Sequence, residues 1–269
     1  GGLRLSYATL GAFVKYPKES LPIKPTANVS HKKYGFFQSE VGVFSEIAQE
    51  LGLSQDSTGS YTRHPLAYLV EAADDICYTI IDFEDGINLG LIEEEFALEY
   101  LINLVRDSIN TKKYHQLSNT TDRISYLRAL SINTLINESV EIFMNNEEEI
   151  IKGVFESSLL DRSKYKAQIS DIIKISVENI YESKEVIEKE IAGYNLISVL
   201  LESYITAANN THEGNTNSYD KLILNLLPDT IDINKPELYS RILEICHYIA
   251  SFSDSQALLI YKKITANEY

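Results

Sequence analysis

The chain has 269 residues, of which 44% are apolar, and carries a formal net charge of −15. This length is enough to bury the core of one large domain, or of a domain and a smaller lobe. The acidic balance excludes a general binder of nucleic acid or other polyanions. Because no run approaches the roughly 20 uninterrupted apolar residues of a membrane span, and the start resembles no signal peptide, we expect a cytoplasmic protein with no membrane segment.

Apolar residues spaced three and four apart run through almost the whole chain and predict an all-α fold. The first predicted helix covers residues 3–16 and ends before Pro17, and residues 17–35 form a loop rich in proline and glycine. The second covers residues 39–51, with Ser39 as its N-cap. Residues 1–40 contain six basic and two acidic side chains. Charge alone leaves two interpretations open, a local anion site or a solvated loop rich in lysine.

The third predicted helix, from Pro65 to about residue 87, carries several carboxylates among its apolar residues. Asp74, Tyr78 and Asp82 follow one another at intervals of four, so they lie on one face as a polar stripe about 12 Å long. One carboxylate suits a hard cation, the other suits a sugar hydroxyl, and the tyrosine offers a ring to stack on. The simpler alternative is a solvated acidic face, and spacing alone does not exclude it.

Further helices are predicted over residues 92–109, 122–160, 164–182, 184–209, 218–226, 236–252 and 254–267. The stretch 110–121, rich in Asn, Thr and Ser, predicts a boundary between residues 1–110 and a helical lobe of residues 111–269. Cys77 and Cys246 are too few and too far apart for a disulfide framework or a zinc site, so we expect buried, reduced thiols.

Four stretches resemble the bacterial deoxyguanosinetriphosphate triphosphohydrolases (dGTPases), which are HD-domain phosphohydrolases. The longest is RHPLAYLVEAADDICY at residues 63–78, and the likeness continues into Asp82, Glu84 and Asp85. The others are GLRLSYATL at 2–10 with KYP at 15–17, KKYGFFQSE at 32–40, and YIASFSDSQAL at 248–258. The resemblance implies an HD-type helical bundle, with residues 1–110 as the C-terminal part of the catalytic core.

It also implies an activity, the metal-dependent hydrolysis of dGTP or another dNTP to a deoxynucleoside and tripolyphosphate. In this family a divalent metal, Mg²⁺ or Mn²⁺, is held by a His, a His-Asp pair and a later Asp, which matches Asp74. Tyr78 and Asp82 match the residues that contact the deoxyribose and its 3′-hydroxyl, and Lys33 matches a lysine that faces the triphosphate. Such enzymes are homo-oligomers, often hexamers, and any role of nucleic acid is expected to be regulatory only.

The chain departs from the family pattern because it has no His-Asp dipeptide. None of its five histidines matches a family ligand, and His64 before Pro65 fits the start of a helix better. The family's first His ligand, its His-Asp pair and its catalytic His and Glu normally lie upstream of these motifs, so we assign no catalytic residue here. We therefore expect the C-terminal portion of a dGTPase, inactive by itself. The alternative is a non-catalytic helical module for regulation or oligomerisation.

Overall fold

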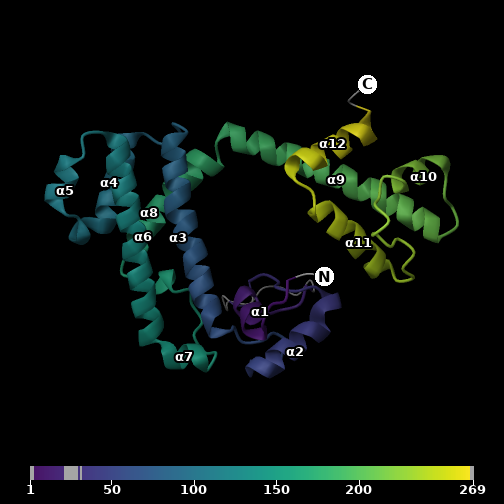
Figure 1. Cartoon of the computed structure of the whole chain (residues 1–269), viewed down its shortest axis with the longest axis horizontal. Coiled ribbons are helices and arrows are strands. Elements are labelled where there is room, and N and C mark those ends of the chain that lie inside the picture. The colour runs from purple at the N-terminus through teal and green to yellow at the C-terminus, as the bar shows by residue number, and fades with distance from the viewer. Residues whose placement is uncertain (1–2, 21–29, 31, 267–269) are drawn as a thin grey trace. The chain divides into compact units, whose positions relative to one another are not determined.

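The computed structural model describes residues 3–20, 30 and 32–266 of the chain (Figure 1). Regular structure in this part of the chain is helical, apart from two isolated β-bridges, Glu19 with Phe36 and Gln55 with Tyr61. The predicted all-α class is therefore confirmed. The contacts between residues divide the chain into two compact units, Gly1–Tyr181 and Glu182–Tyr269, and each unit has its own buried core.

The first unit contains eight α-helices in its described part. They are α1 (Tyr7–Phe13), α2 (Val41–Leu51), α3 (Pro65–Asn88), α4 (Glu94–Val105), α5 (Thr111–Gln116), α6 (Thr120–Asn145), α7 (Glu147–Ile151) and α8 (Lys166–Ser176). Three 3₁₀ turns (Gln38–Glu40, Arg106–Ser108 and Leu160–Arg162) and a π-helical turn (Val177–Tyr181) complete it.

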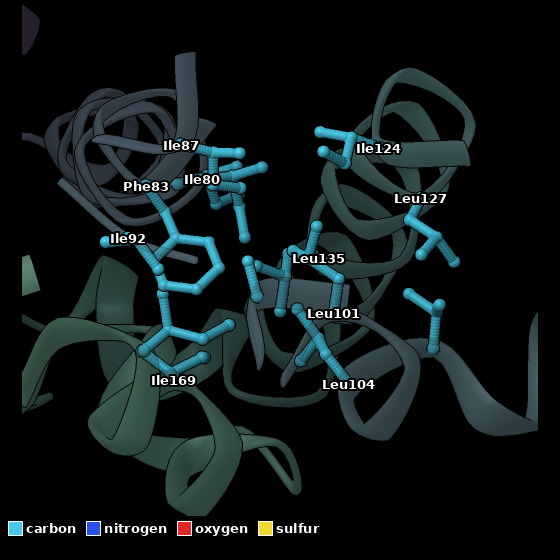
Figure 2. Close-up of a cluster of buried hydrophobic side chains, with 14 of the residues drawn as sticks. Ile80, Phe83, Ile87, Ile92, Leu101, Leu104, Ile124, Leu127, Leu135 and Ile169 are labelled. Carbon is cyan, nitrogen blue, oxygen red and sulfur yellow. The ribbon is translucent and has the colours of Figure 1, made fainter. Parts of the chain in front are cut away.

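The core of the first unit forms where α3, α4, α6 and α8 pack against one another (Figure 2). Phe83 from α3 is fully buried there, together with Leu101 from α4 and Leu135 from α6. Burying one such side chain contributes about 1.5–3 kcal/mol relative to leaving it in water. Because the buried side chains of α3 repeat with helical spacing, the other side of that helix is free to carry polar groups.

Residues typical of helix ends stand at both ends of the long helix α3. Nδ1 of His64 accepts a hydrogen bond from the backbone N–H of Leu66 at 3.2 Å, and Pro65 occupies the first helical position. This confirms His64 as a residue of the helix start. At the other end Gly90 has φ +72°, a left-handed conformation that suits glycine.

The second unit contains α9 (Lys184–His212), α10 (Ser218–Leu224), α11 (Leu238–Ala250) and α12 (Asp254–Thr265). The other three helices pack on the C-terminal half of α9, around the buried Tyr204 and Ile245. By length and composition alone, α9 could cross a membrane, with 22% of its apolar window buried. A core helix of a soluble protein satisfies the same criteria of length and composition, and the absence of a membrane segment stays a prediction.

Several predicted bounds differ from the structure because side chains cap the backbone locally. The helix predicted over residues 3–16 is shorter, since the Ser6 hydroxyl accepts from the N–H of Thr9 and starts α1 at Tyr7. Ser39 is not an N-cap; the carboxylate of Glu40 instead accepts from the N–H of Phe37 at 2.8 Å, within a 3₁₀ turn.

Other predicted helices are interrupted. The helix predicted over residues 122–160 ends at Asn145, because the side-chain amide of Asn146 donates to the carbonyl of Ile142 at 2.7 Å. The helix predicted over 92–109 ends at Val105 and continues only as a 3₁₀ turn. The polar stretch 110–121 contains the short helix α5, and parts of the predicted loop 17–35 lie outside the described residues.

The boundary between the compact units falls after Tyr181, and not at residue 110, where the sequence predicts a boundary. The physical reason is that α6 and α8 bury apolar side chains against α3 and α4. The assignment of residues 1–110 to an HD-type core and of residues 111–269 to a separate lobe stays a prediction.

Two neighbouring residues of α6 test this packing. Leu135 is fully buried, whereas Ile136 is 47% exposed. We expect Leu135→Ala to lower the free energy of unfolding by about 2–5 kcal/mol, because it leaves a cavity among α3, α4 and α6. Ile136→Ala should cost about 1 kcal/mol or less. Urea unfolding followed by circular dichroism measures both values, and equal losses would contradict the described core.

Candidate functional site

The predicted polar stripe lies on the side of α3 that faces away from the core. The side chain of Asp74 is 77% exposed, and Tyr78 is 45% exposed. Asp82 is half-buried. The apolar residues Ile80 and Phe83 of the same helix are buried in the core. The structure therefore brings the three predicted site residues onto one accessible face, while their roles stay predictions.

A residue far along the sequence, Tyr181, completes this face. Its ring stacks on that of Tyr78, with ring centroids 5.4 Å apart and planes inclined by 3°. Its hydroxyl donates a hydrogen bond to Oδ2 of Asp82. Burial and the neighbouring carboxylate of Asp82 raise the pKa of Tyr181 well above its ordinary value, so the phenol stays protonated and remains a donor.

Sequence reasoning missed Tyr181 because nothing local marks it. It ends the π-helical turn Val177–Tyr181, 99 residues after Asp82, inside a stretch predicted as ordinary helix. Single π-helical turns are rare and occur frequently at functional sites. Such a turn is visible only in the backbone, since periodicity does not distinguish it from an α-helix.

A lysine from the segment after α1 lies among the carboxylates at the start of the stripe. Nζ of Lys15 is 3.5 Å from Oε1 of Glu71, 3.8 Å from Oδ1 of Asp75 and 4.0 Å from Oδ2 of Asp74. Burial alone would lower the pKa of Lys15, but the charges of Asp75 and Glu71 outweigh it and raise the pKa. The ammonium therefore stays charged at neutral pH and offsets part of the local negative charge.

At the neighbouring carboxyl of Asp75, burial outweighs the charge of its partner Lys15. Partial burial raises the pKa of Asp75, and Lys15 only partly counteracts this. Thr79, one turn further along, donates its hydroxyl hydrogen bond to the backbone carbonyl of Asp75 at 2.7 Å. The carboxyl of Asp75 is thus less solvated than that of Asp74, although the two residues are adjacent.

A buried ion pair fixes the position of this segment against α3. Nη1 of Arg63 lies 2.6 Å from Oε2 of Glu71, and the two side chains are only 1% and 4% exposed. Nε of Arg63 donates to the backbone carbonyl of Lys15 at 2.7 Å. The guanidinium also lies over the rings of Tyr16 and Tyr68, with 5.6 and 5.2 Å to the ring centroids. Arg63 therefore joins α3 to the chain that carries Lys15.

Lys33 is exposed, and in the described residues no hydrogen bond or ion pair joins it to Asp74, Tyr78 or Asp82. Its neighbour Lys32 contributes to lowering the pKa of Asp161, so this stretch comes near the first unit's polar surface. The structure thus does not assign Lys33 to the stripe, and its role stays a prediction. His31 lies outside the described residues.

The described residues do not by themselves fit a divalent metal. Within residues 3–20, 30 and 32–266, no group of three or more His, Cys, Asp or Glu side chains could hold a metal ion. Asp74 offers one exposed carboxylate, and it forms an ion pair with the cation Lys15 at 4.0 Å. A metal centre that uses Asp74 needs ligands from outside the described residues.

The two cysteines are free, as predicted, but Cys77 is exposed, so the expectation that both are buried is wrong. Cys77 lies one position before Tyr78, on the exposed side of α3, where core packing does not reach it. Cys246 is half-buried, and burial raises the pKa of its thiol.

Comparisons with known proteins identify relatives of this chain at 29–35% identity. No protein-family model matches the chain. A deoxyguanosinetriphosphate triphosphohydrolase-like protein of Synechocystis is 35% identical over 98% of the chain, and one of Pseudomonas aeruginosa is 32% identical over 98%. A deoxyguanosinetriphosphate triphosphohydrolase of Yersinia pestis is 29% identical over 75% of the chain and 43% of its own length. The chain spans about 60% of the length of the first two relatives.

The buried ion pair generates a prediction for stability. We expect Arg63→Met to lower the free energy of unfolding by about 3–5 kcal/mol, because it leaves the carboxylate of Glu71 buried without a partner. The control is Lys152→Met, which breaks the exposed pair with Glu148 and should cost less than about 0.5 kcal/mol. Urea unfolding measures both, and a small loss for Arg63→Met would show that this pair does not hold the segment to α3.

Proposed function

The chain is a homologue of the deoxyguanosinetriphosphate triphosphohydrolase-like proteins, and from this premise we propose that it forms part of a hydrolase that converts dGTP, or another dNTP, to a deoxynucleoside and tripolyphosphate. The observation that carries the proposal is the accessible stripe of Asp74, Tyr78 and Asp82 on α3. Because the chain spans about 60% of these relatives, the activity is that of the whole protein.

The proposal gives the residues of the stripe different tasks. Asp82 accepts a hydrogen bond from the 3′-hydroxyl of the sugar, a partner that its charged carboxylate can hold strongly. The ring of Tyr78 packs against the deoxyribose and limits its rotation. Holding the sugar in one orientation places the triphosphate at a fixed distance along α3, and such positioning lowers the entropic part of the reaction barrier.

In the same proposal Asp74 is one ligand of a Mg²⁺ or Mn²⁺ ion. The described residues do not complete that centre and the sequence contains no His-Asp dipeptide, so in this proposal the other ligands, a His and a His-Asp pair, belong to the rest of the protein. Lys33 contacts the triphosphate in this proposal, and the chain alone is inactive. Homo-oligomeric assembly and a cytoplasmic location stay predictions.

The alternative is a non-catalytic helical module that regulates or assembles a larger protein. One observation favours it, namely the lack of a metal-binding cluster in the described residues. The two functions differ in a measurable way, since only a hydrolase releases tripolyphosphate.

The role of Asp74 is tested with protein expressed from the complete reading frame. We expect the wild type to release tripolyphosphate from dGTP in the presence of Mg²⁺ or Mn²⁺, and Asp74→Ala to reduce the release to background, because a metal ligand is lost. The matched control is Asp85→Ala, an exposed carboxylate further along α3. An unchanged rate in Asp74→Ala would contradict the assignment, and no release from any dNTP would favour the non-catalytic module.

A second prediction concerns the sugar. We expect Asp82→Asn to raise the KM for dGTP about tenfold, with a much smaller change in kcat, because the hydrogen bond to the 3′-hydroxyl loses its charge. A 2′,3′-dideoxynucleotide lacks that hydroxyl, so its KM should be the same for both proteins. Steady-state kinetics with the two nucleotides measures the difference. An equal rise in KM for both would mean that Asp82 does not contact the 3′-hydroxyl.

A further inference from the structure

A cavity of about 280 Å³ lies beside the stripe, between α3 and α8. Tyr78 and Thr79 line it from α3, and Ile169 and Ile173 line it from α8. All of these residues belong to the first unit. Tyr78 therefore borders both the proposed sugar position and this cavity, so a ligand held against Tyr78 can extend into it.

Polar side chains form part of the cavity lining. Asp161, Lys166 and Ser158 are among them, and they contact one another. Oδ1 of Asp161 is 3.2 Å from Nζ of Lys166, and Oδ2 accepts a hydrogen bond from the hydroxyl of Ser158 at 3.0 Å. Burial would raise the pKa of Asp161, but the hydrogen bonds from Lys166 and Ser158 outweigh it and lower the pKa, so the carboxylate is charged at neutral pH.

Asp161 and Lys166 can form further hydrogen bonds to a ligand. A carboxylate accepts about four hydrogen bonds through its two oxygens, and Asp161 uses only part of that capacity. An ammonium group has three N–H donors. The side chains of Asp161 and Lys166 are 49% and 59% exposed, so both can be reached from the cavity. An acceptor and a donor therefore stand side by side.

The size and charge of the cavity limit what can bind. Pockets for whole ligands of drug size measure about 300–1,000 Å³, so this cavity suits one ring system better than a complete nucleotide. Two carboxylates, Asp75 and Asp161, and one ammonium, that of Lys166, line it, and Lys15 lies 3.8 Å from Asp75 outside the lining. The lining therefore has no excess of positive charge with which to hold a phosphate group. The apolar walls and the ring of Tyr78 favour a flat heterocycle.

We propose that this cavity receives the base of the nucleotide and that Asp161 and Lys166 recognise the edge of guanine. The N1–H and N2–H groups of guanine donate to the Asp161 carboxylate, and its O6 accepts from the Lys166 ammonium. Adenine has an acceptor at N1 and no oxygen at C6, so it meets the carboxylate with the wrong group. The inference rests on the proposed function, because it places the base next to a sugar held at Tyr78.

The test compares dGTP with dATP, using protein from the complete reading frame. We expect Asp161→Asn to lower kcat/KM for dGTP about tenfold or more, because hydrogen bonds to a charged acceptor are lost, and to leave kcat/KM for dATP unchanged. The matched control is Asp171→Asn, an exposed carboxylate of α8 that does not line the cavity, which should change neither value. Thermal unfolding verifies that the variants fold. An equal loss for both nucleotides, or no loss, overturns the inference.

A second measurement separates this inference from the proposed function. If the wild type hydrolyses no dNTP, the proposed function fails, and calorimetric titration of the same protein from the complete reading frame with deoxyguanosine and deoxyadenosine still tests the cavity. Preferential binding of deoxyguanosine that Asp161→Asn removes supports the inference. No binding of deoxyguanosine, or binding that Asp161→Asn leaves unchanged, overturns it.

Discussion

The buried ion pair between Arg63 and Glu71 connects α3 to the segment that precedes it. Because neither side chain is accessible to water, each charge depends on the other, and loss of one partner is far more costly than loss of an exposed pair. Arg63 also holds the backbone carbonyl of Lys15, which sets the ammonium of Lys15 among three carboxylates. The position of Lys15, and with it the charge balance at the start of the stripe, therefore depends on the buried pair of Arg63 and Glu71.

The sequence predicts those parts of the site that lie within one helix. Spacing alone places Asp74, Tyr78 and Asp82 on one face of α3, and the buried repeat that includes Phe83 defines the opposite face. It cannot predict Tyr181, because a contact over 99 residues depends on tertiary packing and on a π-helical turn. The compact units also divide after Tyr181 and not at the polar stretch that begins at residue 110, because polar composition indicates a surface segment but does not show which helices share a core.

The contact between Tyr181 and Asp82 also bears on the proposed binding of the sugar. In the described structure the phenol donates to the carboxylate that is proposed to accept the 3′-hydroxyl. A bound sugar must therefore share Asp82 with Tyr181 or displace it. Since Tyr78 stacks on Tyr181 and also lines the cavity beside α8, any movement of Tyr181 changes the surroundings of both the sugar and the base.

Whether the stripe of α3 holds the nucleoside is tested most directly by a crystal structure of the protein from the complete reading frame with a non-hydrolysable dGTP analogue. We expect the deoxyribose against Tyr78, its 3′-hydroxyl within hydrogen-bonding distance of Asp82, and the base between α3 and α8. A nucleotide bound away from α3, with Asp82 still held by Tyr181 alone, would show that the stripe does not bind the nucleoside.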